Sequence, residues 1–282
     1  LIVSTQGRAI WILDNVSSLH QIAANAKASE TILFKPRDGY RTRVAPANLG
    51  PVVEYYLPSA PTGAVAIEIL DSKGAVLNSY TSEAPAARPG RGNTGANMPG
   101  VGGAGPESQP DPDAAPVRRA APPPRVTKTA GINRFAWDVR NQAGVTLPPG
   151  QYQVRMKSGS VTQTQPLNVL IDPRVAADGV TIADLQEQFE HNMRMRALVT
   201  EVNQLVTRVR EAQNKSEALN AVAAKLMNEP VRYGKPGLQS HITYLAGMTA
   251  NVDQKIGRDA IQRYEVLKKE LEAIKAELDR LP

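Results

Sequence analysis

Four aspartates stand beside the ends of expected strands, where a glycosidase could place its acid and its base: Asp14, Asp38, Asp138 and Asp172. Glycoside hydrolysis needs two carboxylates about 5 to 10 Å apart across a cleft. Aspartates at strand ends more commonly cap turns, because their short side chains bond the backbone that follows them. We therefore read these four as turn-capping residues and expect no catalytic residue in this chain.

The residue types that bind metals are sparse. The three histidines, His20, His191 and His241, lie far apart and share no ligand spacing, and the chain contains no cysteine. His191 lies on the apolar face of an expected helix, which predicts a hydrogen-bonded core histidine. The stretch 111–113 (Asp-Pro-Asp) lacks the further oxygen ligands and the shaping glycine of a calcium loop. We expect neither a metal nor a cofactor.

Two further motifs are weak as binding sites. Trp137 could stack on a sugar, but it alternates with apolar residues, which favours a place in a sandwich core. The glycine-rich stretch 100–105 lacks the Lys-Ser/Thr that follows a phosphate loop. The sequence also lacks the G-x-S-x-G elbow, so no serine is indicated as the nucleophile of a hydrolase.

Length and charge limit the class of protein. A chain of 282 residues is long enough for two or three domains with real cores. The net charge is +6, and the basic excess lies before residue 180, with 18 Lys and Arg against 13 Asp and Glu. Aromatic residues make up only 5% of the chain, so stacking surfaces for nucleic acid are not expected. No apolar run reaches the roughly 18 residues that a membrane-spanning helix needs.

The middle of the chain, residues 42–178, has the pattern of an antiparallel β-sandwich of immunoglobulin-like type. Short stretches alternate between apolar and polar residues, and turn formers separate them. The expected strands are 52–57, 64–71, 75–80, 132–140, 150–156 and 162–172.

A Pro/Gly-rich insert, residues 84–125, interrupts this zone with ten prolines, seven glycines and nine alanines. Such a composition buries too little apolar surface to offset its ordering entropy, so alone it should be disordered or polyproline-like. Its arginines would suit an acidic protein surface or anionic lipid headgroups. The candidate partner-binding residues are Arg88, Arg91, Arg118, Arg119 and Arg125.

The last zone, residues 179–282, predicts an antiparallel helical bundle. Thr181 is placed to cap the first helix, with Asp184 three residues on. Apolar residues then recur at helical spacing, and a third helix is expected to run through Ile256 and end at Gly257. The expected core includes Met195, Leu198, Val202, Leu205, Leu267, Leu271 and Ile274.

The first zone, residues 1–41, opens on a strand at 10–13 that has no earlier strand to pair with, followed by a connector. The stretch TQGRAIWILDN, residues 5–15, resembles the closing strand of large bacterial BNR (Asp-box) β-propeller proteins. These proteins are sortilin-like and often labelled glycosyl hydrolases. Gln6 stands where that family usually has His. Further stretches resemble the sandwich and helical tail of the family: GINRFAWDVR, LPPGQYQVRM and RYGKPGLQSHITYLAGMTANVDQKIGRDAIQRYEVL.

This resemblance implies the C-terminal region of such a protein: a propeller-terminal strand, the sandwich and the bundle, in an extracytoplasmic setting, periplasmic or secreted. No Asp-box occurs here, so no propeller-face site carries over to a residue of this chain. We expect a non-catalytic interaction or scaffolding region that binds a protein partner or a larger assembly. Two alternatives stay open: an accessory portion of a glycoside hydrolase whose active site lies upstream, and a peripheral subunit or assembly factor of a membrane complex, for example a photosynthetic one.

Overall fold

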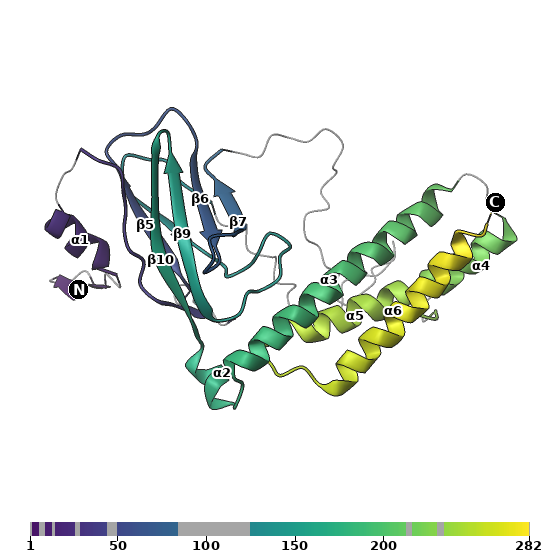
Figure 1. Cartoon of the computed structure of the whole chain (residues 1–282). Coiled ribbons are helices and arrows are strands. Elements are labelled where there is room, and N and C mark those ends of the chain that lie inside the picture. The colour runs from purple at the N-terminus through teal and green to yellow at the C-terminus, as the bar shows by residue number, and fades with distance from the viewer. Residues whose placement is uncertain are drawn as a thin grey trace.

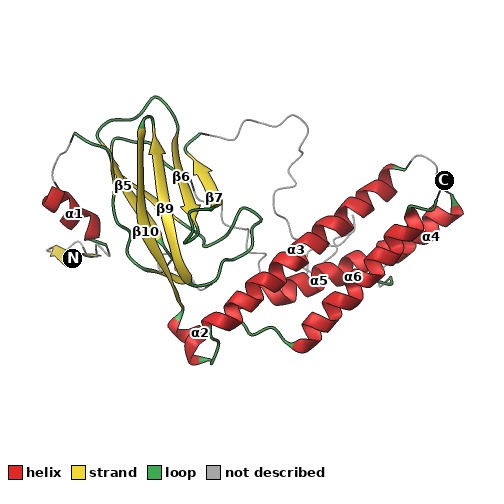
Figure 2. Cartoon of the chain, in the orientation of Figure 1, coloured by secondary structure: helices red, strands yellow, loops and turns green. Residues whose placement is uncertain are grey.

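The computed structural model describes residues 2–5, 9–12, 15–25, 29–43, 50–83, 125–212, 216–229 and 234–281. It is a mixed α/β structure in which two sheets form one part and a helical region extends away from them (Figures 1 and 2). The strands are β1 Ile2–Thr5, β2 Ala9–Ile12, β3 Ile32–Leu33, β4 Gly39–Arg41, β5 Val52–Leu57, β6 Val65–Leu70, β7 Val76–Thr81, β8 Gly131–Ala136, β9 Gly150–Ser158 and β10 Val161–Ile171. The helices are α1 Ser17–Asn25, α2 Pro173–Ala177, α3 Ile182–Glu211, α4 Glu217–Leu226, α5 Leu238–Ala250 and α6 Arg258–Leu278.

Two sheets of the described chain enclose the first core. One has the strand order β4-β10-β9-β6-β7, and the other has the order β3-β5-β8. Burial alternates along β5, so that Val53, Tyr55 and Leu57 point inward. Trp137 is buried in this core, as its alternating neighbours predicted, and its ring makes an edge-to-face contact with the Tyr152 ring. A strand with one buried face needs this period of two, because successive side chains point to opposite faces.

Two expectations about the sandwich are wrong in detail. The sheets are not purely antiparallel, because β4 pairs with β10 in parallel. The domain boundary expected near residue 41 is the second, because residues 32–41 supply a strand to each of the two sheets. Strand β3 pairs with β5 in one sheet, and β4 pairs with β10 in the other.

Glutamine side chains hold β3 beside the long strand β10. Gln163 accepts a hydrogen bond from the Leu33 backbone N–H (2.6 Å) and donates one to the Thr31 carbonyl (2.9 Å). Gln165 donates to the Leu33 carbonyl (3.2 Å). These bonds satisfy the backbone of β3 on the side that faces away from β5.

The opening strand has a partner, contrary to the expectation. Strand β2 pairs with β1 in an antiparallel hairpin, with Ile2 opposite Ile12 and Thr5 opposite Ala9. The strand also lies at 9–12, one residue earlier than expected. It is not inserted into the sandwich, because β5 and β8 pair directly with each other.

The helices pack around a second core. A capping box starts α3: Thr181 Oγ1 accepts from the Asp184 N–H (3.1 Å), and the Asp184 carboxylate accepts from the Thr181 N–H (2.9 Å). The predicted core residues are all buried, as the periodicity required. They are Met195, Leu198, Val202, Leu205, Leu267, Leu271 and Ile274.

The predicted end of the third helix of the bundle, at Gly257, is wrong. α5 ends at Ala250, and Gly257 is the residue that caps the start of α6. Ile256 is buried outside any helix, while Val252 is exposed. Of the helices in the described ranges, none combines the length and apolar character that crossing a membrane requires.

Candidate functional site

The two sheets, which we call the sandwich, and the helices meet at a cluster of charged and polar side chains, which we call the clasp: Arg41, Arg43, Gln188 and Asp253. Arg41, Gln188 and Asp253 are buried, whereas the Arg43 side chain is 27% exposed. Arg41 Nη2 donates to Asp253 Oδ1 (2.7 Å) and to Gln188 Oε1 (2.9 Å). Arg43 Nε donates to the same carboxylate oxygen of Asp253 (2.6 Å). The side chains of Arg41 and Asp253 are only 2% and 3% exposed.

The four members of the clasp come from three parts of the chain. Arg41 ends β4, opposite Ile171 on β10, and Arg43 lies two residues after it. Gln188 lies in the second turn of α3, and Asp253 lies between α5 and α6. The clasp thus joins the end of β4 to α3 and to the segment between α5 and α6, and Phe189 of α3 packs against the core of the sandwich.

Side chains from the same part of α3 donate hydrogen bonds to backbone carbonyls at the end of α5. Gln188 Nε2 donates to the carbonyls of Thr249 (2.8 Å) and Val252 (2.6 Å). Asn192 Nδ2 donates to the Thr249 carbonyl as well (3.2 Å). The last carbonyls of a helix lack partners within it, so these amides replace water at a buried helix end. Gln188 therefore couples the end of α5 to Arg41.

The electrostatics of the clasp are those of a structural ion cluster. One carboxylate faces two guanidinium groups, and burial lowers the pKa of Arg41 while Asp253 opposes that shift. A guanidinium stays charged in a protein, so the buried charge must be paired. This paired arrangement can fix the orientation of the elements that carry it.

Several buried polar atoms around the clasp have no hydrogen-bond partner among the described residues. They are Arg41 Nε and Nη1, both ring nitrogens of His191, and Asn192 Oδ1. His191 was expected to be a hydrogen-bonded core histidine: it is buried, but no described residue forms a hydrogen bond with its ring. Its ring instead meets the Tyr264 ring edge to face, with centroids 5.9 Å apart.

The burial of His191 predicts a pH dependence of stability. Burial, and to a lesser degree the Arg194 guanidinium, lowers the pKa of His191 below its ordinary value of 6.5. The unfolded chain then binds the proton more readily, so stability should be complete above about pH 6.5 and fall as the pH drops toward the folded-state pKa. Urea unfolding at about pH 7.5 and 5 measures the loss. His191→Leu should lose less stability over this interval than the parent, whereas the exposed-site control His241→Gln should behave like the parent. An unchanged loss in His191→Leu would contradict this role.

The expected partner-binding arginines fall mostly outside the described residues. This is the case for Arg88, Arg91, Arg118 and Arg119. Arg125 is exposed, directly before Val126, which is buried in the sandwich core. The structure thus places only the last of these five residues.

The aspartates considered for catalysis have structural contacts where they are described. Asp172 caps α2 and binds Arg174, whose guanidinium holds the pKa of that carboxyl well below its usual range. Asp38 accepts from Asn168 (3.0 Å), and Asp138 lies 3.4 Å from the Tyr80 hydroxyl and 3.9 Å from Arg140. Asp14 lies outside the described residues. Within the described ranges, no group of three or more His, Asp or Glu side chains could hold a metal ion.

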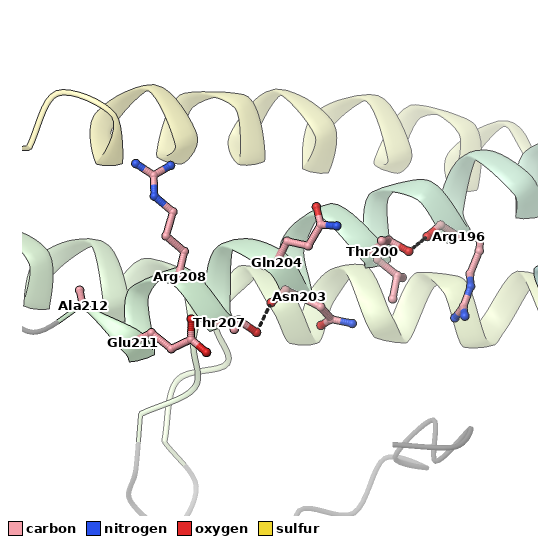
Figure 3. A pocket seen from close by; sticks show the side chains of 9 residues that line it. Arg196, Thr200, Asn203, Gln204, Thr207, Arg208, Glu211 and Ala212 are labelled. Carbon is pink, nitrogen blue, oxygen red and sulfur yellow. Dashed lines mark hydrogen bonds between the residues drawn. The ribbon is translucent and has the colours of Figure 1, made fainter. Parts of the chain in front are cut away.

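A groove of about 940 Å³ runs along the exposed face of α3 (Figure 3). Many of its polar groups are already engaged: Thr200 and Thr207 donate to carbonyls one turn back, and Arg208 pairs with Asp279 (2.6 Å). A second recess continues past Arg196 toward Ala143 of the sandwich. In the described part of the chain, the groove offers a polar helix face without a pair of acids. Its lining residues are Arg196, Val199, Thr200, Asn203, Gln204, Thr207, Arg208, Glu211 and Ala212.

Comparison with models of protein families, with curated proteins and with solved structures gives no match to this chain.

Sequence reasoning missed the clasp, although one signal for it was present. Gln188 and Asn192 occupy positions on the helical stripe that runs from Leu185 to Met195, where apolar residues are expected. Polar residues at core positions need buried partners. Which residues those partners were could not be read from the sequence.

Proposed function

We propose that this chain is a non-catalytic scaffolding and interaction region that holds a β-sandwich and a helical bundle at a fixed angle for a protein partner or larger assembly. The clasp is the observation that carries the proposal. A flexible linker would let the two parts move independently. A buried ion cluster instead holds them in one orientation, because breaking its contacts would leave a buried charge without a partner. A partner that touches both parts then meets a preformed surface and loses less entropy on binding.

The wider assignment belongs to the same proposal. We propose that the sheets form an immunoglobulin-like sandwich and that the chain is the C-terminal region of an extracytoplasmic BNR propeller protein. The two-layer sheet packing and the separate β1-β2 hairpin support this architecture. An isolated two-stranded hairpin is marginal in water, so β1 and β2 would gain stability from further strands. Fold likeness alone carries no activity.

We also propose that the arginines of the Pro/Gly-rich insert contribute to partner binding. Five arginines in 42 residues with only three acidic residues give the segment a positive charge. Arg guanidinium groups bind carboxylates and phosphates through paired hydrogen bonds. An acidic protein surface or anionic lipid headgroups would provide such acceptors.

The orientation and the binding can be tested together. The chain has no cysteine, so the pair Ser79→Cys on β7 and Glu272→Cys on α6 can carry two spin labels at unique sites. The parent should give one narrow distance distribution, and the same labels with Asp253→Asn should give a broader one. Proteins captured by the parent but lost by folded Asp253→Asn would support a partner that needs both parts. A broad distribution in the parent would contradict the fixed scaffold.

The chain itself should not turn over glycosides or peptides. The three described aspartates that were considered for catalysis support this expectation: Asp172 caps a helix, Asp38 accepts a hydrogen bond from Asn168, and Asp138 pairs with Arg140. A glycosidase would instead need an acid and a base that face each other across a cleft. A panel of glycosides and peptide substrates assayed with the purified chain should give no rate above buffer. Reproducible turnover that is lost in Asp138→Asn or Asp14→Asn would instead support the hydrolase alternative.

A further inference from the structure

A second side-chain contact, between Asn141 and Met193, connects the sandwich to α3. Asn141 lies in the turn between β8 and β9, and its Nδ2 donates to Met193 Sδ of α3 (3.2 Å). Unlike the core of the clasp, this contact is open to water, because Met193 is 36% exposed. A thioether sulfur is only a weak hydrogen-bond acceptor, so the contact is weak as it stands.

The amide of Asn141 is held with its nitrogen toward the sulfur. Asn141 Oδ1 accepts from the Val145 N–H (2.9 Å), and the Asn141 N–H donates to the Val145 carbonyl (3.0 Å). The next residue ties this turn to the sandwich, because the Gln142 N–H donates to the Leu77 carbonyl on β7 (3.0 Å). A change at Met193 Sδ therefore acts on a turn that is fixed to the sheets.

Met193 is a methionine that an oxidant in solution can reach. In the described part of the chain, Met156 and Met195 are buried, Met227 is intermediate, and Met193 and Met248 are exposed. Exposed thioethers are oxidised to sulfoxides, and methionine sulfoxide reductases reverse the change. The chain contains no cysteine, so no thiol competes for the oxidant.

The surroundings of Met193 suit an added oxygen. A recess of about 640 Å³ lies beside it, lined also by Ala143 of the turn and by Arg196, one helical turn further along α3. The carboxylate that lines this recess, Glu201, is paired with Lys275 (2.8 Å). A sulfoxide is polar where a thioether is apolar, and the flexible methionine side chain can turn its oxygen toward Asn141 Nδ2.

We propose that Met193 is a reversible oxidation site, at which a peroxide strengthens the contact between the sandwich and α3. The sulfur lone pair attacks one peroxide oxygen, and the O–O bond breaks as the S–O bond forms. The proton on the transferred oxygen passes to the departing hydroxide, which leaves as water. The sulfur is oxidised by two electrons, the peroxide is reduced by two, and the new oxygen accepts the hydrogen bond from Asn141. The site adds regulation to the proposed scaffold role, on which its function rests.

Hydrogen exchange measured by mass spectrometry tests the site in the full chain, before and after treatment with hydrogen peroxide. Peptide masses should show sulfoxide at Met193 and Met248 but not at Met156 or Met195. Amide exchange in the turn 141–147 should slow about fivefold on oxidation, the effect of one stronger hydrogen bond. Methionine sulfoxide reductase should restore the original rate.

Variants assign the effect to one pair of side chains. Oxidation should no longer slow exchange in Met193→Leu, whereas the matched control Met248→Leu should respond like the parent. Asn141→Asp keeps an oxygen for the Val145 N–H but removes the Nδ2 donor, so it should lose the response as well. Met193→Gln supplies an amide oxygen without an oxidant and should slow exchange in the untreated chain. Circular dichroism shows whether each variant is folded.

The outcomes separate this site from the scaffold. Exchange in the turn that stays the same or becomes faster on oxidation would overturn the proposal, and so would slowing that persists in Met193→Leu. The scaffold itself is tested by the spin-label distances of the untreated chain. Slower exchange on oxidation together with a broad distance distribution in the untreated chain would support the oxidation site and contradict the scaffold alone.

Discussion

Replacing Asp253 with alanine should lower the free energy of unfolding by about 3 to 5 kcal/mol, the usual cost of removing one partner from a buried ion pair. The substitution leaves the Arg41 guanidinium buried with only Gln188 as a hydrogen-bond acceptor among the described residues. Arg43 loses the same carboxylate. Urea denaturation followed by circular dichroism measures the change.

An exposed ion pair provides the matched control for Asp253. Lys225 and Glu277 lie 2.7 Å apart, and their side chains are 53% and 41% exposed. Glu277→Ala should therefore cost no more than about 1 kcal/mol, and added salt should reduce that cost further. The effect of Asp253→Ala should change little with salt. Equal costs for the two variants would show that the clasp is solvated and does not fix the sandwich on the bundle.

Replacing Leu271 with alanine should destabilise the chain by about 2 to 5 kcal/mol. Leu271 is 1% exposed in the helical core, so the substitution removes buried apolar surface and leaves a cavity. Most of the stability of helices in proteins comes from the packing of an apolar face, which is why the bundle depends on such contacts. Thermal and urea unfolding should both detect the loss.

Two variants separate packing from helix propensity in this experiment. Leu271→Met keeps the volume and should cost less than about 1.5 kcal/mol. Val266→Ala lies on the same helix at a position that is 43% exposed, and it should change stability by no more than about 0.5 kcal/mol. A loss below about 0.5 kcal/mol for Leu271→Ala would place this face of α6 in solvent.

Local patterns in the sequence determined most of the secondary structure. The alternation in VVEYYL predicted β5 with its correct bounds, and Thr181 with Asp184 predicted the start of α3. The buried stripe from Met195 to Leu205 followed from helical spacing. These features were readable because each depends on residues within a few positions of one another.

The misplaced features depend on contacts that local patterns do not encode. The expected orphan strand has a partner because Ile2–Thr5 folds back on it, and a four-residue strand at the chain start gave little signal. The third helix of the bundle ends at Ala250 because Gln188 and Asn192 of α3 bind carbonyls at and beyond its end. Propensity alone could not reveal that stop.

The clasp was decided by the tertiary structure alone. Arg41 and Asp253 are 212 residues apart in the sequence, and Arg41 and Gln188 are 147 apart. The sequence determined that charged and polar residues stand at these positions, but an arginine after a short strand reads equally well as a surface residue. Only the folding of β4 beside β10, which leads directly into α2 and α3, brings Arg41 to the end of α5. Once there it is removed from water, and a charge without water must be paired.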